Sequence, residues 1–336
     1  MKTSDFDYQL PPELIAQTPI ESRDQSRLMV LHRNNSTTEH RRFYDIMDYL
    51  QDGDTMVFNN SRVIPARIMG EKGDGHTKVE IMLLKNLGEN LWEALVRPGK
   101  KIINGTRIIV VGGAIEAEVV EQRDNGIRVI SFSDDSEIEK FGRIPLPPYI
   151  HKPLEDAERY QTVYARTKGS VAAPTAGLHF TTELLERLRN KGVQLAFITL
   201  HIGLDTFRPV RVDDPSRHVI HGEFGELTPE VAALINETKD RGKKVIAVGT
   251  SSVRLLEAAS QTGRVQPISG WVDLFIIPGY KFLATDVMVT NFHLPRSTLL
   301  MLVSAFAGRD FIINAYEQAK KLNYRFYSFG DAMLIL

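Results

Sequence analysis

The chain has 336 residues, of which 43% are hydrophobic and 25% are charged, and its formal net charge is −1. These values are typical of a globular protein with enough apolar side chains for one large domain or two smaller ones. The absence of cysteine excludes disulfides, thiolate metal sites and cysteine nucleophiles, and the near-zero charge excludes nucleic-acid binding driven by total charge alone.

The first residues and the apolar runs of the chain bear on its location. Residues 1–7 carry acids and no apolar h-region, which is unlike a signal peptide. The longest uncharged apolar run, 297–308, is shorter than the roughly 18 residues that a membrane span requires. We therefore expect a cytoplasmic protein.

The N-terminal part contains a predicted strand at 27–31 and a predicted helix near 44–50. These elements are too few to fold alone. Between about 62 and 149 the pattern changes to six short runs rich in β-branched residues, at 63–69, 79–84, 91–97, 107–111, 115–120 and 127–132. Glycine-containing turns separate the runs, and helical periodicity is lacking, so we predict a six-stranded antiparallel β-barrel.

After the proline-rich stretch 144–149 the chain alternates between strands and helices. Strands are predicted at 193–200 and 244–248, and helices at 182–191, 228–242, from 251 onward, 297–308 and 310–321. This alternation predicts an α/β fold with a mostly parallel sheet covered on both faces. We expect residues 1–61 and 150–336 to form one discontinuous α/β domain and 62–149 to be a barrel inserted into it.

A predicted buried strand runs directly into Gly249, and two hydroxyl residues, Thr250 and Ser251, follow it at a helix start. Ligands of α/β sheets gather at the carboxyl ends of strands, and a helix N-terminus favours an anion. Together with Arg254, these residues predict an anion-binding site. An ordinary serine or threonine helix cap explains the same pattern equally well.

Histidines mark three further motifs. His201 ends an apolar strand, His179 precedes a helix start in Pro174-Thr175-Ala176-Gly177-Leu178-His179, and His293 lies in Thr290-Asn291-Phe292-His293 before an apolar helix. A fourth segment, His218-Val219-Ile220-His221-Gly222-Glu223, could ligate zinc or iron, but its spacing is not a standard one and a solvated polar loop explains it as well. We predict no metal site.

Two basic stretches contain no acid, 94–114 and 159–182, and aromatic residues lie within the second. Basic residues beside aromatic ones suit phosphate contact and base stacking. A chance gap in a mixed surface would look the same. The candidate RNA-binding residues are Arg97, Lys100, Lys101, Arg159, Arg166 and Lys168.

The joint order of these motifs resembles the S-adenosylmethionine:tRNA ribosyltransferase-isomerase family of queuosine biosynthesis. The resemblance runs from Phe6-Asp7-Tyr8-Gln9-Leu10-Pro11 to the C-terminus and includes Gly142-Arg143-Ile144-Pro145-Leu146-Pro147-Pro148-Tyr149. The family commonly has Asp-Thr where this chain has Asn60-Ser61, so no catalytic role is assigned to position 60. It also commonly has threonine at Ser251, a change that keeps a hydroxyl.

The resemblance implies an α/β domain with an inserted β-barrel and a cytoplasmic bacterial enzyme, which we expect to be a monomer. It implies transfer and isomerisation of the ribosyl part of S-adenosylmethionine, a co-substrate rather than a prosthetic group, onto 7-aminomethyl-7-deazaguanine at the tRNA wobble position. Epoxyqueuosine-tRNA, adenine and methionine would be the products. Candidate catalytic residues are His179, His201 and Glu223, with Gly249, Thr250, Ser251 and Arg254 binding the co-substrate.

Two other functions stay open at this stage. A metal-dependent hydrolase would use His201, His218, His221 and Glu223 as ligands. A non-catalytic RNA-binding module would rest on the barrel and the two basic stretches, but it would leave the polar motifs of the α/β part unexplained.

Overall fold

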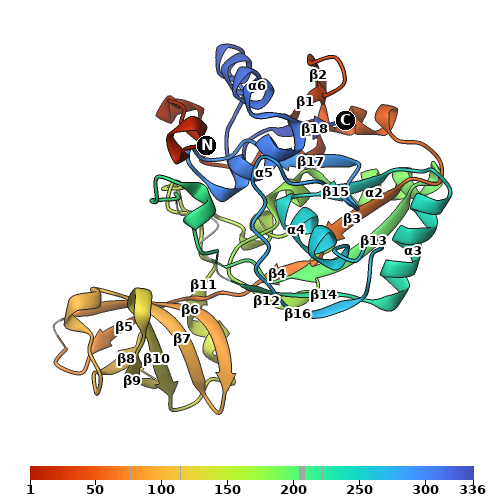
Figure 1. Ribbon diagram of the computed structural model, residues 1–336. Helices are drawn as coiled ribbons and strands as arrows, with labels where there is room; N and C mark the ends of the chain where they lie inside the picture. Colours follow the sequence, from red (N-terminus) through yellow and green to blue (C-terminus); the bar gives the residue numbers. More distant parts are fainter. Residues whose placement is uncertain (76, 114, 204–208, 221) are drawn as a thin grey trace. The chain divides into compact units, whose positions relative to one another are not determined.

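The computed structural model describes residues 1–75, 77–113, 115–203, 209–220 and 222–336 (Figure 1). The chain forms two compact units. The large unit comprises Met1–Ser61, Pro147–Thr167 and Ala173–Leu336, and the small unit comprises Arg62–Leu146 and Lys168–Ala172. Each unit is described separately below.

The large unit is built on one sheet, which has nine strands within the described residues. In spatial order the strands are β16 (Ile268–Val272), β14 (Glu223–Leu227), β13 (Gln194–Leu200), β3 (Thr55–Asn59), β15 (Val245–Val248), β17 (Val287–Asn291), β18 (Ala332–Ile335), β1 (Arg27–His32) and β2 (Thr37–Arg42).

The directions of these strands make the sheet mixed. Strands β13, β3, β15 and β17 are parallel neighbours, and β1 is parallel to β18. The other neighbours are antiparallel, including β14 and β16 at one edge and β2 at the other. The α/β fold is therefore confirmed. The sheet is parallel through its centre and at the β18–β1 pair, and the strands β14, β16 and β18 were not among the predicted elements.

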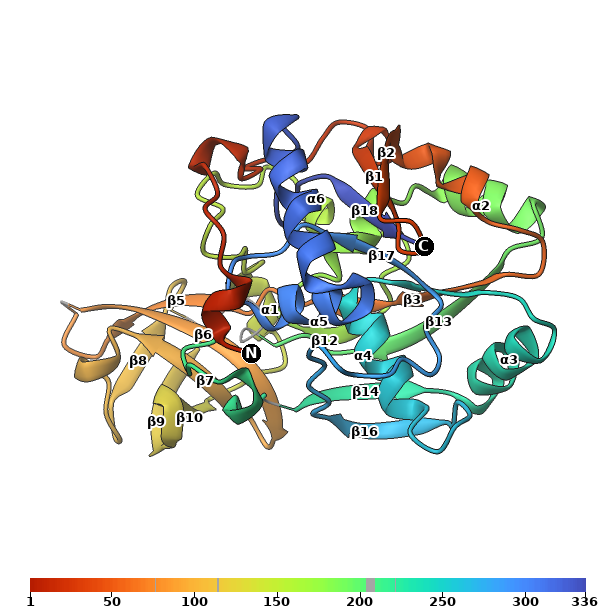
Figure 2. The ribbon, with the colours of Figure 1, turned by 45° about the horizontal axis from the view of Figure 1, so that its top comes forward.

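Helices cover both faces of this sheet, as the alternation of strands and helices predicts. One core contains Val57 of β3 with apolar residues of α3 (Pro229–Asp240), α4 (Thr250–Ala259), α5 (Thr298–Ala307) and α6 (Arg309–Lys321). The other core contains Met56 and Phe58, which point to the opposite face, with α2 (Thr182–Asn190) and the 3₁₀ segment η4 (Phe43–Tyr49). Helix α4 packs against α5, and α5 packs against α6 (Figure 2).

No single helix within the described residues is both long and apolar enough to cross a membrane. Helices α5 and α6 meet that standard only as a pair, and they are bent by 112° relative to each other.

The small unit confirms the predicted six-stranded antiparallel barrel within its described residues. Its strands follow the order β5 (Arg67–Lys72), β6 (Lys78–Gly88), β7 (Leu91–Arg97), β10 (Ile127–Phe132), β9 (Glu116–Gln122) and β8 (Arg107–Val110), and β8 pairs back with β5. Gly70 makes this closure possible, because a Cβ atom there would lie only 2.7 Å from Cγ2 of Ile108. A short helix, α1 (Ile138–Phe141), and the two-residue strand β11 (Gly142–Arg143) follow, and β4 (Ser61–Val63) pairs with β12 (Thr167–Ser170) separately.

Candidate functional site

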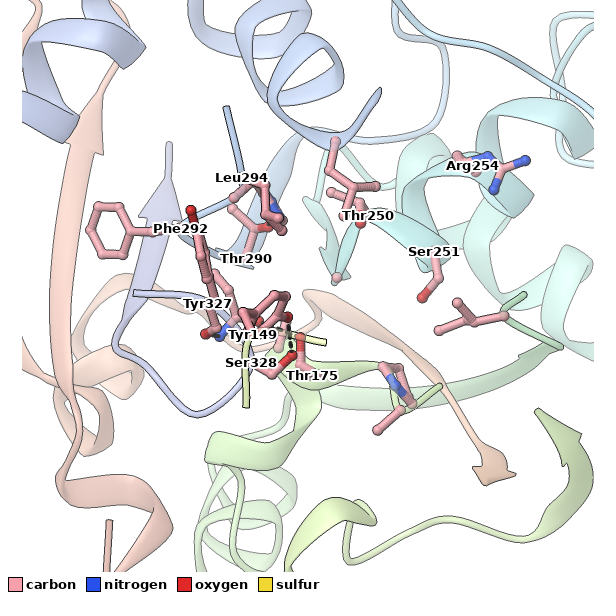
Figure 3. Close-up of a pocket in the computed structure, with 18 of the residues that line it drawn as sticks. Tyr149, Thr175, Thr250, Ser251, Arg254, Thr290, Phe292, Leu294, Tyr327 and Ser328 are labelled. Atoms are coloured by element: carbon pink, nitrogen blue, oxygen red, sulfur yellow. Dashed lines mark hydrogen bonds between the residues drawn. The ribbon is translucent and has the colours of Figure 1, made fainter. Parts of the chain in front are cut away.

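The large unit contains a cavity at the carboxyl ends of its parallel strands (Figure 3). It encloses about 660 Å³ of space, with open solvent at its mouth included. The lining residues come from segments far apart in the chain: Tyr149, Ala173, Pro174, Thr175, Ala176, Ile202, Glu223, Gly249, Thr250, Ser251, Arg254, Thr290, Asn291, Phe292, His293, Leu294, Leu299, Tyr327 and Ser328. We call this space the strand-end cavity.

One side of the strand-end cavity is the N-terminus of α4. Gly249 precedes the helix with φ +88°, a left-handed backbone conformation that a residue with a side chain adopts only under strain. No side chain caps this end, and its first turn contains no acidic residue. Asn59 at the end of β3 donates a hydrogen bond to Oγ of Ser251 (3.2 Å), which fixes that hydroxyl. The unoccupied amide groups and the helix dipole make this side suitable for an anion.

A buried ion pair lies beside this helix end. Arg254 Nη1 is 2.5 Å from Oε2 of Glu223, and the two side chains are only 7% and 9% exposed. Arg254 also donates to the carbonyl oxygens of Leu274 and Val272, and Glu223 Oε1 accepts a hydrogen bond from the backbone of Gly203 (2.8 Å). The opposite charges compensate each other, so the pair brings no net charge to the cavity.

A chain of hydrogen bonds fixes the opposite side of the cavity. Asn291 Nδ2 lies 3.2 Å from Nε2 of His179 and donates to the carbonyl oxygen of Tyr327. Because a carbonyl oxygen only accepts, this contact fixes the orientation of the amide, and Nε2 of His179 is the acceptor. The proton of His179 is then on Nδ1, 2.7 Å from Oγ of Ser26.

These hydrogen bonds also decide whether the Thr175 hydroxyl acts as a donor or as an acceptor toward a ligand. The Thr175 hydroxyl donates its only hydrogen to Oδ1 of Asn291, over 2.9 Å. The same hydroxyl lines the cavity, where its oxygen is left as an acceptor. A ligand group placed against Thr175 must therefore be a hydrogen-bond donor, such as a hydroxyl or an amine.

The remaining titratable groups of this wall are held neutral at pH 7. Burial lowers the pKa of His293 to about 3, and Nε2 of His293 lies 2.7 Å from Oγ1 of Thr290. Burial raises the pKa of Tyr327 to about 12 and that of Tyr149 well above its usual value. The Tyr149 hydroxyl lies 2.7 Å from Oγ of Ser328, and Figure 3 shows these residues beside Tyr327 and Thr175. The phenols can thus exchange hydrogen bonds with a ligand but carry no charge.

The residues predicted from the sequence divide into two groups. Glu223, Gly249, Thr250, Ser251 and Arg254 line the strand-end cavity together. The two predicted catalytic histidines, His179 and His201, are not among its lining residues.

Each of these histidines is held by a different contact. His179 lies behind Asn291, and burial, with contributions from Arg325 and Arg23, lowers its pKa to about 3. The His201 ring instead stacks on Phe224 at 6.4 Å, and burial lowers its pKa despite the opposing effect of Glu226. Neither ring lines the strand-end cavity in this structure.

Sequence reasoning did not select several lining residues as site residues, namely Tyr149, Thr175, Asn291, His293, Tyr327 and Ser328. Thr175, Asn291 and His293 lie in motifs that were recognised, and the polar pair Thr290-Asn291 at the end of a buried strand was the available signal. Tyr327 and Ser328 lie just before the last strand, and Tyr149 ends the proline-rich stretch, so nothing local marked them.

The proposed metal ligands of the alternative hydrolase do not gather within the described residues. No group of three His, Asp or Glu side chains there is arranged as metal ligands would be. Glu223 is paired with Arg254, and the ring of His218 lies against Phe275. His221 is outside the described residues.

The predicted RNA-binding residues differ in their contacts. Arg97, Lys100 and Lys101 of the small unit are exposed, as is Arg166 of the large unit. Arg159 donates to the backbone carbonyls of Glu21 and Ile20.

Lys168 forms an ion pair with Glu139 at 2.6 Å. Within the described residues, hydrogen bonds and an ion pair therefore engage two of the three predicted residues of the second stretch, Arg159 and Lys168.

Comparison with known proteins assigns the chain to one protein family. Residues 3–335 match the family model described as "Queuosine biosynthesis protein". A protein of Dehalococcoides mccartyi (strain CBDB1) named S-adenosylmethionine:tRNA ribosyltransferase-isomerase is 58% identical over the full length of both chains, and one of the same name from Desulforamulus reducens is 54% identical, also over both full lengths. The crystal structure of an S-adenosylmethionine tRNA ribosyltransferase from Thermotoga maritima is 43% identical, with a TM-score of 0.59, over 99% of this chain and 100% of that one.

Proposed function

The chain belongs to the family of queuosine biosynthesis proteins, and on that premise we propose that it is an S-adenosylmethionine:tRNA ribosyltransferase-isomerase. The observation that carries the proposal is the match to relatives of this name over their full length, at 54–58% identity. The strand-end cavity supports it, because polar groups line opposing sides of a concave site at the carboxyl ends of the parallel strands.

The reaction joins two substrates without an external oxidant or reductant. The aminomethyl nitrogen of 7-aminomethyl-7-deazaguanine in tRNA forms a bond to a ribosyl carbon of S-adenosylmethionine, the bonds from the ribosyl part to adenine and to the methionine sulfur break, and a new bond within the ribosyl part completes the isomerisation. The amine and C5′ each lose one proton, of which the leaving adenine takes one and solvent takes the other. The products are epoxyqueuosine-tRNA, adenine and methionine. The positive sulfur makes the neighbouring C5′ protons acidic, so the activating charge belongs to the co-substrate and not to a metal or prosthetic group.

We assign binding roles by the polarity of each side of the cavity. The uncapped α4 N-terminus, with Gly249, Thr250 and Ser251, suits the methionine carboxylate. The Thr175 oxygen suits a hydroxyl or amine donor of the co-substrate, because Asn291 fixes it as an acceptor. The Glu223–Arg254 pair would shape the cavity wall between β14 and α4 without contributing net charge.

We propose that the substrate amine is the base that removes the C5′ proton. Among the cavity groups with a shifted pKa, His293 is too weak a base at neutral pH, and Tyr149 and Tyr327 stay protonated. His179 would act as a positioning residue through Asn291. Loss of adenine would be assisted by protonation of the leaving base.

The tRNA would contact both units. We propose that the large unit is the catalytic domain and that the small unit is a separate barrel domain with exposed Arg97, Lys100 and Lys101 for phosphate contact.

The proposal is tested by incubating the protein with S-adenosylmethionine and tRNA that carries the aminomethyl precursor. Adenine and methionine should appear together, and neither should appear with tRNA that lacks the aminomethyl group. Release that does not depend on this group would show that the amine is not the acceptor, and the proposed reaction would be wrong.

A further inference from the structure

Three aromatic side chains lie in register across neighbouring strands at one edge of the large-unit sheet. Phe224 of β14 is the direct partner of Trp271 of β16, and the backbone nitrogen of His201, just beyond β13, donates to the carbonyl oxygen of Phe224 (2.9 Å). The ring centroids are 6.4 Å apart for His201 and Phe224 and 5.9 Å apart for Phe224 and Trp271. We call these three residues the aromatic row.

The aromatic row faces away from the core. Trp271 is 55% exposed and Phe224 is 37% exposed, whereas the next residues along the two strands, Gly225 and Val272, are buried. A Cβ atom at Gly225 would meet Leu255 of α4, so α4 covers the opposite face. Large exposed rings grouped in this way are uncommon on a soluble protein and mark a binding surface.

The row lies next to the strand-end cavity along the chain. Ile202 and Glu223, which line the cavity, are the immediate chain neighbours of His201 and Phe224. Alternation along an extended chain turns successive side chains to opposite sides. The row and the cavity are therefore on opposite sides of the same strand end, and a base that follows the nucleotide in the cavity reaches the row by passing around that end.

The charges around the row point to bases more than to phosphates. The backbone nitrogen of Arg166, an exposed residue, donates to the carbonyl oxygen of Asn60. Oδ1 of Asn60 in turn accepts a hydrogen bond from the hydroxyl of Thr199 (2.7 Å). Thr199 lies two residues before His201, on the same face of the strand. Glu226 lies opposite Thr199, so this face carries a negative charge as well as Arg166. A face of mixed charge with exposed rings favours stacking of bases over attraction of phosphates.

We propose that the aromatic row binds unpaired bases of the tRNA substrate by stacking, with Trp271 and Phe224 as the main contacts. The proposal rests on the proposed function, since it deepens how that substrate is held. Stacking of a base on an aromatic side chain tolerates any base, because every base has an apolar face.

The chain offers a direct optical test. It has two tryptophans, and the other one, Trp92, is buried in the barrel, where Nε1 donates to Asp135 (2.8 Å). In a Trp92→Phe protein, Trp271 is the only tryptophan. Its fluorescence should be quenched when precursor-bearing tRNA binds and should change little with a blunt RNA duplex that lacks unpaired bases.

Substitutions separate stacking from other contacts. Trp271→Ala and Phe224→Ala should each weaken tRNA binding about tenfold, raise KM for tRNA and leave KM for S-adenosylmethionine unchanged, while Trp271→Phe should restore most of the affinity. The dependence of binding on salt should keep the slope of the parent, because no phosphate contact is lost. Tyr44→Ala, which removes an exposed aromatic ring elsewhere on the large unit, is the matched control and should bind as the parent does.

Normal tRNA affinity in both alanine variants would overturn the proposal. So would a change in self-association without a change in tRNA affinity, which would assign the row to contacts between copies of the chain. If adenine release is normal in the parent and in these variants alike, the aromatic row is wrong while the proposed function stands. If the parent releases no adenine, the proposed function fails whatever the variants do.

Discussion

The amide nitrogen of Asn291 lies 3.2 Å from Nε2 of His179, and this contact places the histidine behind the cavity wall. Because Nε2 accepts from Asn291, His179 must stay neutral, and its lowered pKa, about 3, is consistent with that role. The histidine therefore orients Asn291, and Asn291 in turn orients the hydroxyl of Thr175.

We predict that His179→Ala weakens binding of S-adenosylmethionine without removing an ionisation. Loss of the oriented amide should raise KM for this co-substrate by roughly fivefold to thirtyfold, the equivalent of about one or two hydrogen bonds. The shape of the kcat profile between pH 6 and 9 should match that of the parent. If the rise or the fall of kcat with pH disappears in the variant while KM is unchanged, His179 transfers a proton itself. His151→Ala, at an exposed histidine, is the control.

Two buried histidines should make stability depend on pH. Burial lowers the pKa values of His179 and His293 to about 3, whereas an unfolded histidine has a pKa of about 6.5. The unfolded state binds more protons in this window, so the stabilisation is fully present above pH 6.5 and is lost as the pH falls toward 3. Each histidine should lower the free energy of unfolding by about 1.4 kcal/mol per pH unit below pH 6.

Urea unfolding at several values between pH 7.5 and pH 5 measures this dependence. In the His179→Gln variant, the slope of the free energy of unfolding against pH should be smaller by the equivalent of about one bound proton. Equal slopes in the parent and the variant would mean that His179 is not held neutral by the fold.

Removal of one partner of the buried pair Glu223–Arg254 should strongly reduce the stability of the fold. Arg254→Met leaves a buried carboxylate without its cation and should lower the free energy of unfolding by about 3–5 kcal/mol. Arg264→Met is the matched control, because its pair with Asp240 has side chains 58% and 59% exposed, and the loss of such a solvent-exposed pair should change the free energy of unfolding little. A stable Arg254→Met protein that binds S-adenosylmethionine poorly would instead support direct contact of Arg254 with the ligand.

Exposed basic residues of the barrel should contribute to tRNA binding through phosphates. The double variant Lys100→Ala/Lys101→Ala should weaken tRNA binding and reduce its salt dependence by roughly one unit of slope per lost contact. KM for S-adenosylmethionine should be unchanged. Lys168→Ala should have a smaller effect, because Lys168 is already paired with Glu139. An unchanged salt dependence in the double variant would show that the RNA approaches elsewhere.

Local patterns predicted those parts of the fold and site that depend on neighbours in the chain. The barrel strands and the turn at Gly249 were of this kind, since alternating apolar residues and a glycine before a helix are visible in the sequence. Strands β14 and β16 were missed because they are short, they lie at or next to the edge of the sheet, and some of their residues face away from the core. Their exposed residues include Phe224 and Trp271 of the aromatic row.

The composition of the cavity required the tertiary structure. Thr175, Asn291 and Tyr327 are more than 30 residues apart in the chain, and they are connected by hydrogen bonds at the end of β17. A histidine at the end of a strand could be recognised from the sequence, but the face to which it points could not. For this reason His201 was expected at the reaction site and is found beside Phe224.

The most direct test of the central claim is the amount of adenine released per modified tRNA, measured with EDTA present. The account predicts one adenine and one methionine for each precursor base converted to epoxyqueuosine, identified by mass after digestion of the tRNA. It predicts the same amounts without EDTA, because the activating charge belongs to S-adenosylmethionine. Adenine release without a change in the mass of the wobble nucleoside, or activity that EDTA abolishes and zinc restores, would contradict it.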